Sequence, residues 1–509
     1  MGTTMRTKRL GWVVLLGTAG VMGCSGADGG TSLFPHGSAD GSTGGGSDAS
    51  NSTGGDDGGA NGGDGTTSGD GDILHVVTTC NQGLACAQVQ CDGGVTTTVS
   101  GIVYDPAGKV PLYNVVVYVP NAPVQPFSSN GATCDKCGGT VSGSPLVITL
   151  TNAKGEFVLN NVPAGTMIPL VMQIGKWRRQ VKIPMVAPCI ENQLTDHDLT
   201  RLPRNQGEGD IPRIALTTGG ADPLECLPRK IGLDDAEFTT AGGMGRVHLY
   251  AGGGWIEPSA DGGMTTHDAS AGFAPKLNGG MAFADATNFW NSASELQKYD
   301  ILLMACEGTL NKPTKPASAL AALYDFENAG GRVFASHWHR YWFSDGPAPV
   351  PSVGTWTDRI DPAATGTTAI GTVNTGFPKG MALRDWLVNV GASTTPGELP
   401  IKDSKHNLDA VNSAEAQDWI SMPNPKAGNQ TAVQYMTFNT PIGKPDTALC
   451  GRVVFSDLHV SSGDQPGQPF PSGCVTTDLS PQEKALEFML FDLSSCVSSD
   501  SVPPTPPPR

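Results

Sequence analysis

The pattern of apolar and polar residues divides this chain into stretches of different character. A short apolar run covers 10–21, and residues 25–72 then consist almost wholly of Gly, Ser, Thr, Asp, Asn and Ala. Such a composition offers too little apolar surface to offset the entropy of ordering, which predicts a disordered linker. Short alternating strands begin near residue 96, and strands alternate with helices after residue 230. The pattern therefore predicts a multidomain chain, with an antiparallel β-sandwich followed by an α/β doubly wound sheet.

Alternating apolar residues predict the sandwich. Val99, Gly101 and Val103 alternate before a turn at 105–108. Further strands are expected at 115–119, 146–150, 156–159, 168–174 and 178–183. The segment 120–145 interrupts this pattern and is expected to project as a loop.

Helical periodicity enters the pattern after residue 230. Residues 318–329 have one apolar helical face, and apolar strands flank them at 301–305 and 332–336. A strand, a helix and a strand with short joins predict a right-handed βαβ unit, and hence an open parallel sheet with helices on both faces. A capping box of Ser480 and Glu483 predicts the start of the last helix. Other strands are expected at 246–251, 432–438 and 452–456.

The N-terminus has the features of an export signal. Arg6, Lys8 and Arg9 precede the apolar run, which is too short for a transmembrane helix and is followed by Met22, Gly23 and Cys24. Residues 1–24 resemble a bacterial lipoprotein signal. The resemblance implies cleavage after residue 23, a diacylglyceryl group on Cys24 that anchors the chain in a membrane, and a place at the outer membrane or cell surface.

Composition and pattern together give the predicted domain boundaries. Residues 1–23 are the signal peptide, 24–72 the lipidated cysteine and disordered linker, and 73–95 a cysteine-containing connecting segment. The sandwich covers 96–210, a linker 211–229, the α/β domain 230–496, and a Pro-rich disordered tail 497–509.

The charge of the chain argues against nucleic acid as a partner. The formal net charge is −16, and no Lys or Arg occurs in 25–72, where aspartates are frequent. Phosphate backbones would be repelled by such a chain. An unknown extracellular or periplasmic ligand is the expected partner.

Twelve cysteines in an exported chain predict a disulfide framework. Lipidation of Cys24 leaves an odd number, so one thiol should stay free, and Cys306 is the candidate because it follows the apolar run 301–305. The Cys134–Cys137 pair has redox spacing but no helix behind it, which favours a structural role. Spacing does not determine the pairing. The ten disulfide candidates are Cys80, Cys86, Cys91, Cys134, Cys137, Cys189, Cys226, Cys450, Cys474 and Cys496.

Two families resemble parts of the chain. Residues 99–108, 111–118, 151–157 and 162–165 resemble the carboxypeptidase regulatory-like domain, a transthyretin-like sandwich without catalytic residues. That resemblance covers about 95–200 and implies scaffolding or recognition. Residues 299–308, 328–337 and 451–459 more distantly resemble the flavodoxin-like fold of class I glutamine amidotransferases and ThuA-like proteins. The whole chain resembles a group of bacterial surface lipoproteins.

Candidate chemistry follows the predicted strands, because ligands of open α/β sheets bind outside the carboxyl ends of the strands. Cys306 with His459 or His337 would form a thiol–imidazole nucleophile, and Glu307 lies beside the thiol. The resemblance to amidotransferases pairs Cys306 with His459. Met304, however, stands where a nucleophile elbow needs a small residue. A buried free thiol is therefore the favoured interpretation of Cys306.

A metal site is the second possibility. His337 and His339 would point to one side of an extended strand end, with Glu307, Asp457 or His459 completing the ligands of a divalent metal. The aromatic residues around these histidines equally suit packing at a sheet edge, and no other cofactor is expected. The sequence thus favours a non-catalytic binding or scaffold module on a flexible stalk. The alternatives are a surface hydrolase using Cys306, or a metal site at His337 and His339.

Overall fold

The computed structural model describes residues 83–127 and 131–509. The predicted signal peptide, the linker to residue 72, Cys24 and Cys80 lie outside the described residues. All the described residues belong to one compact unit, 72–509. Among them, no helix is both long and apolar enough to cross a bilayer.

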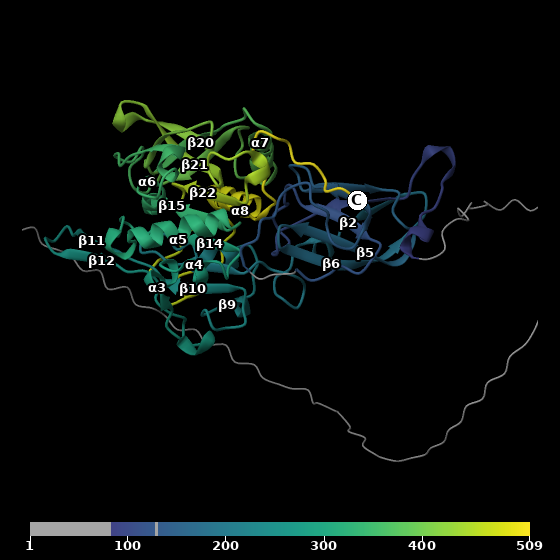
Figure 1. The fold of residues 1–509 in the computed structure, drawn as a ribbon, viewed down its shortest axis with the longest axis horizontal. Helices are drawn as coiled ribbons and strands as arrows, with labels where there is room; N and C mark the ends of the chain where they lie inside the picture. The colour runs from purple at the N-terminus through teal and green to yellow at the C-terminus, as the bar shows by residue number, and fades with distance from the viewer. Residues whose placement is uncertain (1–82, 128–130) are drawn as a thin grey trace, which may run out of the picture. The chain divides into compact units, whose positions relative to one another are not determined.

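Residues 98–194 form two β-sheets. One sheet has the order β4-β1-β7, and the other has the order β3-β2-β5-β6. Strands β2, β5 and β6 of the second sheet are labelled in Figure 1. Apolar residues such as Val99, Phe157 and Val117 are buried between them. The bounds are β1 Thr98–Ile102, β2 Val116–Pro120, β3 Pro145–Leu150, β4 Glu156–Asn160, β5 Gly165–Ile174, β6 Trp177–Val186 and β7 Glu191–Leu194. The predicted strands are all present, but β1 and β7 pair in parallel, so the sandwich is not wholly antiparallel.

The second half of the chain is built on an eleven-stranded sheet with the order β13-β10-β8-β14-β15-β22-β21-β20-β17-β18, with β9 paired to β10. In this order, each strand from the β13 edge as far as β22 runs parallel to its neighbour, and β9 is parallel to β10. These parallel strands are β8 Ile214–Thr217, β9 Phe238–Thr239, β10 Val247–Ala251, β13 Ala284–Asp285, β14 Ile301–Met304, β15 Arg332–Ser336 and β22 Gly451–Ser456.

The rest of this sheet corrects the expectation of an open parallel sheet. Strands β21 (Gln430–Thr440), β20 (Ala416–Asn424), β17 (Thr368–Val373) and β18 (Glu398–Lys402) continue it antiparallel. The short connection 441–450 between β21 and β22 explains the change, because parallel neighbours need a crossover of about a dozen residues or more.

The predicted linker 211–229 contains β8, an interior strand of the parallel part of the sheet. β8 lies between β10 and β14 and is buried along its whole length. Its apolar run is only Ile214-Ala-Leu216, too short to be distinctive, which is why the sequence pattern did not show it.

Helices cover both faces of the parallel strands. On β14, Ile301 and Leu303 belong to the same apolar cluster as Leu486 and Met489 of α8 (Pro481–Ser494). The alternate residues Leu302 and Met304 share the other cluster with Leu320 and Leu323 of α5 (Ala317–Asn328). Successive strand residues point to opposite faces, so α8 and α5 pack on opposite sides. The capping box at Ser480 is present as predicted.

The remaining elements are short, except for α7 (Pro378–Asn389). A hairpin of β11 (Trp255–Pro258) and β12 (Met264–His267) follows β10, and β16 (Gly354–Trp356) pairs with β19 (Leu408–Val411). The short helices are α1 His197–Thr200, α2 Cys226–Lys230, α3 Ala286–Trp290, α4 Ala293–Leu296 and α6 Tyr341–Ser344.

Disulfides connect distant parts of the described chain. The four bonds are Cys91–Cys189, Cys134–Cys450, Cys137–Cys496 and Cys226–Cys474. Cys86 is also disulfide-bonded, and Cys306 is the free cysteine among the described residues. Each cysteine of the predicted structural pair at 134 and 137 has a partner more than 300 residues away, so the insertion 120–145 is fastened to the second half of the chain and does not simply project.

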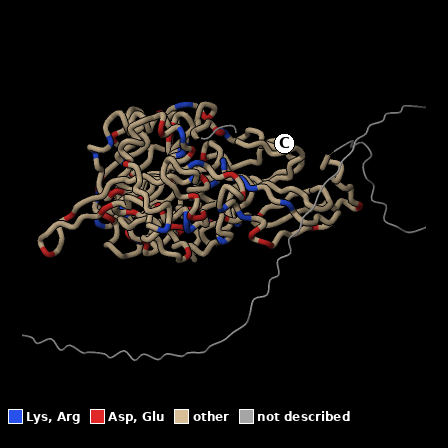
Figure 2. Tube along the Cα trace, turned by 90° about the horizontal axis from the view of Figure 1, so that it is seen from below, with Lys and Arg blue, Asp and Glu red and all other residues tan. Residues whose placement is uncertain are grey.

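The tail after Cys496 is partly ordered, contrary to the predicted disorder. The backbone amide of Val497 donates to the carbonyl of Asp135, and the buried Asp500 pairs with Arg452 at 2.8 Å. The Cys137–Cys496 bond and this ion pair hold 497–500 in place, and 501–509 is largely exposed. Acidic and basic residues are interspersed along the described chain, as Figure 2 shows, and many of them form such pairs.

Candidate functional site

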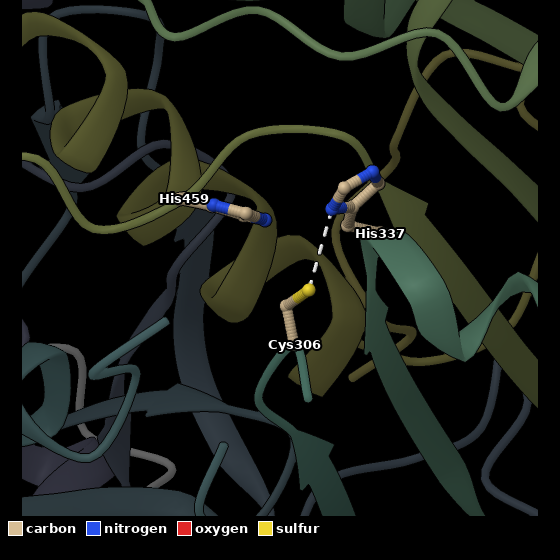
Figure 3. Close-up of side chains that lie close together, drawn as sticks. All are labelled: Cys306, His337 and His459. Carbon is tan, nitrogen blue, oxygen red and sulfur yellow. Dashed lines mark hydrogen bonds between the residues drawn. The ribbon is translucent and has the colours of Figure 1, made fainter. Parts of the chain in front are cut away.

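Three predicted residues converge where neighbouring strands end. Cys306 follows β14, His337 follows β15 and His459 follows β22, and these strands are adjacent in the sheet. One donor atom from each side chain lies within 4.8 Å of the other two. Figure 3 shows the thiol of Cys306 and the rings of His337 and His459 facing a common centre.

The Cys306 thiol is completely buried. Its Sγ lies 3.3 Å from His337 Nδ1 and accepts a hydrogen bond from the Gly308 amide at 3.4 Å. Burial raises the pKa of the Cys306 thiol above its ordinary value, so the sulfur is protonated at neutral pH. This environment differs from that of reactive cysteines, which are partly exposed beside cations.

The two imidazoles are uncharged. Burial lowers the pKa of His337 well below its ordinary value and lowers the pKa of His459 to about 3. Among the described residues, His459 Nε2 has no hydrogen-bond partner although the atom is buried. His337 has a φ of 46°, in the left-handed region that few residues with a side chain adopt. Strained backbone of this kind concentrates at functional sites.

Asp222, which the sequence analysis did not single out, supports this cluster. Its carboxylate accepts hydrogen bonds from the Ser336 hydroxyl at 2.8 Å and from the Val460 amide at 3.0 Å. Ser336 and Val460 are the chain neighbours of His337 and His459, so one buried carboxyl fixes both histidine-bearing segments. Burial raises the pKa of Asp222 to about 7. The available signal was the Gly-Gly pair at 219–220 with Asp222 two residues later, but β8, which precedes this loop, was not predicted.

Glu307 takes part in a different network from its neighbour Cys306. It forms a buried ion pair with Lys315 at 2.5 Å and accepts hydrogen bonds from the Gly253 amide and Asn311 Nδ2, both at 2.9 Å. Burial would raise the pKa of Glu307, but His339 and Lys315 lower it overall. The structure therefore does not join Glu307 to Cys306 and His459 as one catalytic group.

The structure does not bring His339 together with His337, the other residue of the predicted metal-ligand pair. His339 Nε2 bonds the Ala305 carbonyl at 2.9 Å, and its Nδ1 accepts from Trp342 Nε1 at 2.9 Å. The reason is local: residues 337–340 form a 3₁₀ turn and not an extended strand end, so side chains two apart do not share a face. Both ring nitrogens of His339 are occupied, and the residue anchors the turn.

Asp457 lies near the same strand ends but outside the group of three. Its Oδ2 accepts a hydrogen bond from the Asn407 amide at 3.0 Å, and burial raises the pKa of Asp457 to about 8. Its Oδ1 has no partner among the described residues. The carboxyl is thus largely protonated at neutral pH, which makes it a poor metal ligand in this state.

The β11–β12 hairpin covers the loop behind Cys306. A side chain on Gly308, which has φ of 82°, would collide with the Trp255 ring, so glycine lets the indole lie directly against this loop. The Trp255 and His267 rings stack at 4.3 Å.

No protein-family model and no curated protein matches the chain. Among solved structures, a ThuA-like protein from Bacteroides uniformis is similar over 58% of this chain and 95% of that chain, with 11% identity and a TM-score of 0.28. A mutant cohesin–X-dockerin complex from Acetivibrio cellulolyticus is similar over 28% of this chain and 75% of that chain, with 16% identity and a TM-score of 0.14. TM-scores this low support no argument about function.

Proposed function

We propose that this chain is an exported, lipid-anchored binding protein whose second half presents a ligand site at the carboxyl ends of its parallel strands and performs no covalent catalysis. The observation that carries the proposal is the convergence of Cys306, His337 and His459 at a single point with a fully buried thiol. The Cys24 lipid anchor and the linker would place this site outside the cytoplasm, where a disulfide-rich chain is expected.

The order of the parallel strands supports the location of the site. The five parallel strands of four or more residues are β8, β10, β14, β15 and β22, and in space they follow the order 2-1-3-4-5. This is the order of flavodoxin-like sheets, whose ligands bind where the order reverses, beside the first strand. Cys306 follows β14, one of the two strands that flank β8.

The same geometry argues against a thiol hydrolase. An attacking thiolate needs a lowered thiol pKa or a base, and space for a carbonyl carbon about 3 Å from the sulfur. Here the sulfur is surrounded by Ala305, Gly308 and the turn that starts at His337, and two uncharged imidazoles lie beside it. The 3.3 Å Cys306–His337 contact is the one observation that favours the hydrolase.

Alkylation and turnover together test the proposal. Iodoacetamide should leave Cys306 unmodified in the native protein and modify it, and no other cysteine of the mature chain, after unfolding without reduction. Panels of amide and ester substrates should show no turnover. Labelling of native Cys306 by a thiol-directed activity probe, with labelling and turnover both lost in His459→Ala, would show that the protein is a hydrolase.

A further inference from the structure

The side chains that meet at the strand ends form a donor set suited to one class of ligand. One sulfur and two imidazole nitrogens converge, and no carboxylate belongs to the group of three. Thiolate and imidazole ligands select zinc-like and copper-like ions, whereas calcium and magnesium need oxygen ligands. The chemistry of the group therefore points to a thiophilic transition metal.

The spacing of the donors agrees with a shared ion. Metal–sulfur and metal–nitrogen bonds of about 2.3 and 2.0–2.1 Å at a tetrahedral angle separate the two donors by about 3.6 Å. Cys306 Sγ and His337 Nδ1 are 3.3 Å apart, and the third donor lies within 4.8 Å of both. Adjustments of a few tenths of an ångström to about 1 Å, within the range of side-chain rotation, would bring all three to bonding distance.

A second observation also points to a ligand. The Nε2 atom of His459 is buried without a hydrogen-bond partner among the described residues, a state that costs free energy when nothing binds there. His459 is the ligand whose segment Asp222 holds through the Val460 amide. The unpartnered nitrogen thus lies on a fixed segment, as expected for an atom prepared to bind.

The oxidation state of the thiol is consistent with such a role. Every other described cysteine is disulfide-bonded, and Cys306 is held apart from all of them in the core. A thiol without a second thiol nearby cannot be lost to an intramolecular bond. The sulfur therefore remains available as a ligand in an oxidising compartment.

We infer that Cys306, His337 and His459 form a three-ligand site for a thiophilic divalent transition-metal ion of the zinc class, an inference that rests on the proposed binding function and names its ligand. Three protein ligands leave a fourth position for water or a further ligand atom. Binding forms a metal–sulfur bond and breaks the S–H bond, so that one proton is released to solvent per ion, while both imidazoles bind in their neutral form.

Cobalt(II) is the probe for this site because it occupies zinc sites and is coloured. The full chain, purified in detergent without a histidine tag and stripped with chelator, should take up one Co(II) with a thiolate-to-cobalt absorption band and release about one proton per ion. Zn(II) should displace the cobalt and raise the Tm. Cys306→Ser should lose the band, and His337→Gln or His459→Gln should weaken binding by at least about tenfold.

The matched control is His197→Gln, which removes an exposed imidazole far from the cluster in sequence and should bind cobalt like the wild type. Circular dichroism establishes that each variant is folded. A folded wild type without the band, or a His459→Gln variant that binds cobalt as tightly as the wild type, overturns the metal site. If the metal test fails and the protein also shows no turnover, the site binds a ligand other than a metal. Turnover on amides or esters would overturn the binding proposal itself.

Discussion

The carboxylate of Asp222 accepts a hydrogen bond from the hydroxyl of Ser336, at 2.8 Å, in the interior of the protein. The other oxygen of the same carboxylate accepts from the Val460 amide. Asp222 thereby couples the ends of β15 and β22, which carry two of the three converging side chains. The arrangement makes a residue from the loop after β8 responsible for the geometry of a site to which it contributes no donor atom.

Replacement of Asp222 tests this coupling. Asp222→Ala leaves the Ser336 hydroxyl and the Val460 amide buried without partners, at about 1–3 kcal/mol for each group. We expect a loss of about 2–6 kcal/mol in the free energy of unfolding, measured with urea, and faster alkylation of native Cys306. Ser336→Ala is the control, because it removes one of these bonds and leaves the carboxylate with the other. Equal stability of Asp222→Ala and wild type would contradict the role given to Asp222.

The buried ion pair of Glu307 and Lys315 gives a second prediction. Glu307→Gln leaves the Lys315 ammonium in a site where both side chains are 1% exposed. Loss of one partner of such a pair costs about 3–5 kcal/mol, whereas apolar replacement of both is often close to neutral. Glu307→Gln should therefore unfold at clearly lower denaturant concentration than Glu307→Met combined with Lys315→Met. If the double Met variant unfolds at the lower denaturant concentration, the ion pair stabilises the protein more than apolar side chains do at the same positions, which contradicts this prediction.

The buried carboxyls predict a loss of stability as the pH rises toward 8. Burial raises the pKa of Asp222 to about 7 and the pKa of Asp457 to about 8, whereas both groups are ionised above pH 5 in the unfolded chain. Between about pH 4 and these folded pKa values the native state binds more protons, so the free energy of unfolding falls as the pH rises over this range and levels off above about pH 8. The low pKa of His459 affects the pH dependence of stability only below about pH 6.5, because the unfolded histidine becomes charged there and the native one does not.

Thermal unfolding between pH 6.5 and 8.5 checks this prediction. The Tm should fall by at least about 2 °C over this range. Asp457→Asn should flatten the dependence, because it replaces the titrating group with a neutral one of similar size. A Tm that is constant or rises from pH 6.5 to 8.5 would contradict the assignment of neutral buried carboxyls.

The anchoring of the chain is a prediction from its first residues. Cys24→Ala should move the protein from the membrane fraction to the soluble fraction, because lipid on this cysteine is the proposed attachment. Labelled palmitate should enter the wild type and not the variant. Retention of an unlabelled Cys24→Ala protein in membranes would contradict lipid anchoring.

The sequence pattern predicted the strands whose apolar runs are long enough to be distinctive. The segments 301–305, 332–336 and 452–456 closely match β14, β15 and β22, and this agreement is why Cys306, His337 and His459 were expected at strand ends. The four-residue β8 had no such run, so the sheet lacked its first strand in the prediction, and Asp222 remained unnoticed.

Side-chain partners were less accessible to sequence reasoning than strand positions. Glu307 pairs with Lys315 across a Pro-containing loop whose path no local pattern defines. His339 was expected beside His337 because an extended backbone was assumed, and a single 3₁₀ turn changed its direction. Such outcomes depend on backbone direction over three or four residues, a scale at which apolar periodicity carries little information.

The two long-range disulfides of the 120–145 insertion determine when the covalent structure can be completed. Cys134 and Cys137 are synthesised 316 and 359 residues before their partners Cys450 and Cys496. Until the end of the chain has emerged, these two thiols have only each other and other early cysteines within reach. The native bonds can therefore form only after Cys450 and Cys496 have been synthesised, and any earlier bond between Cys134 and Cys137 must first be exchanged. Oxidative maturation of this protein thus depends on the segment that carries Cys496, and a chain without Cys496 would retain an unpaired, exchange-competent thiol at Cys137.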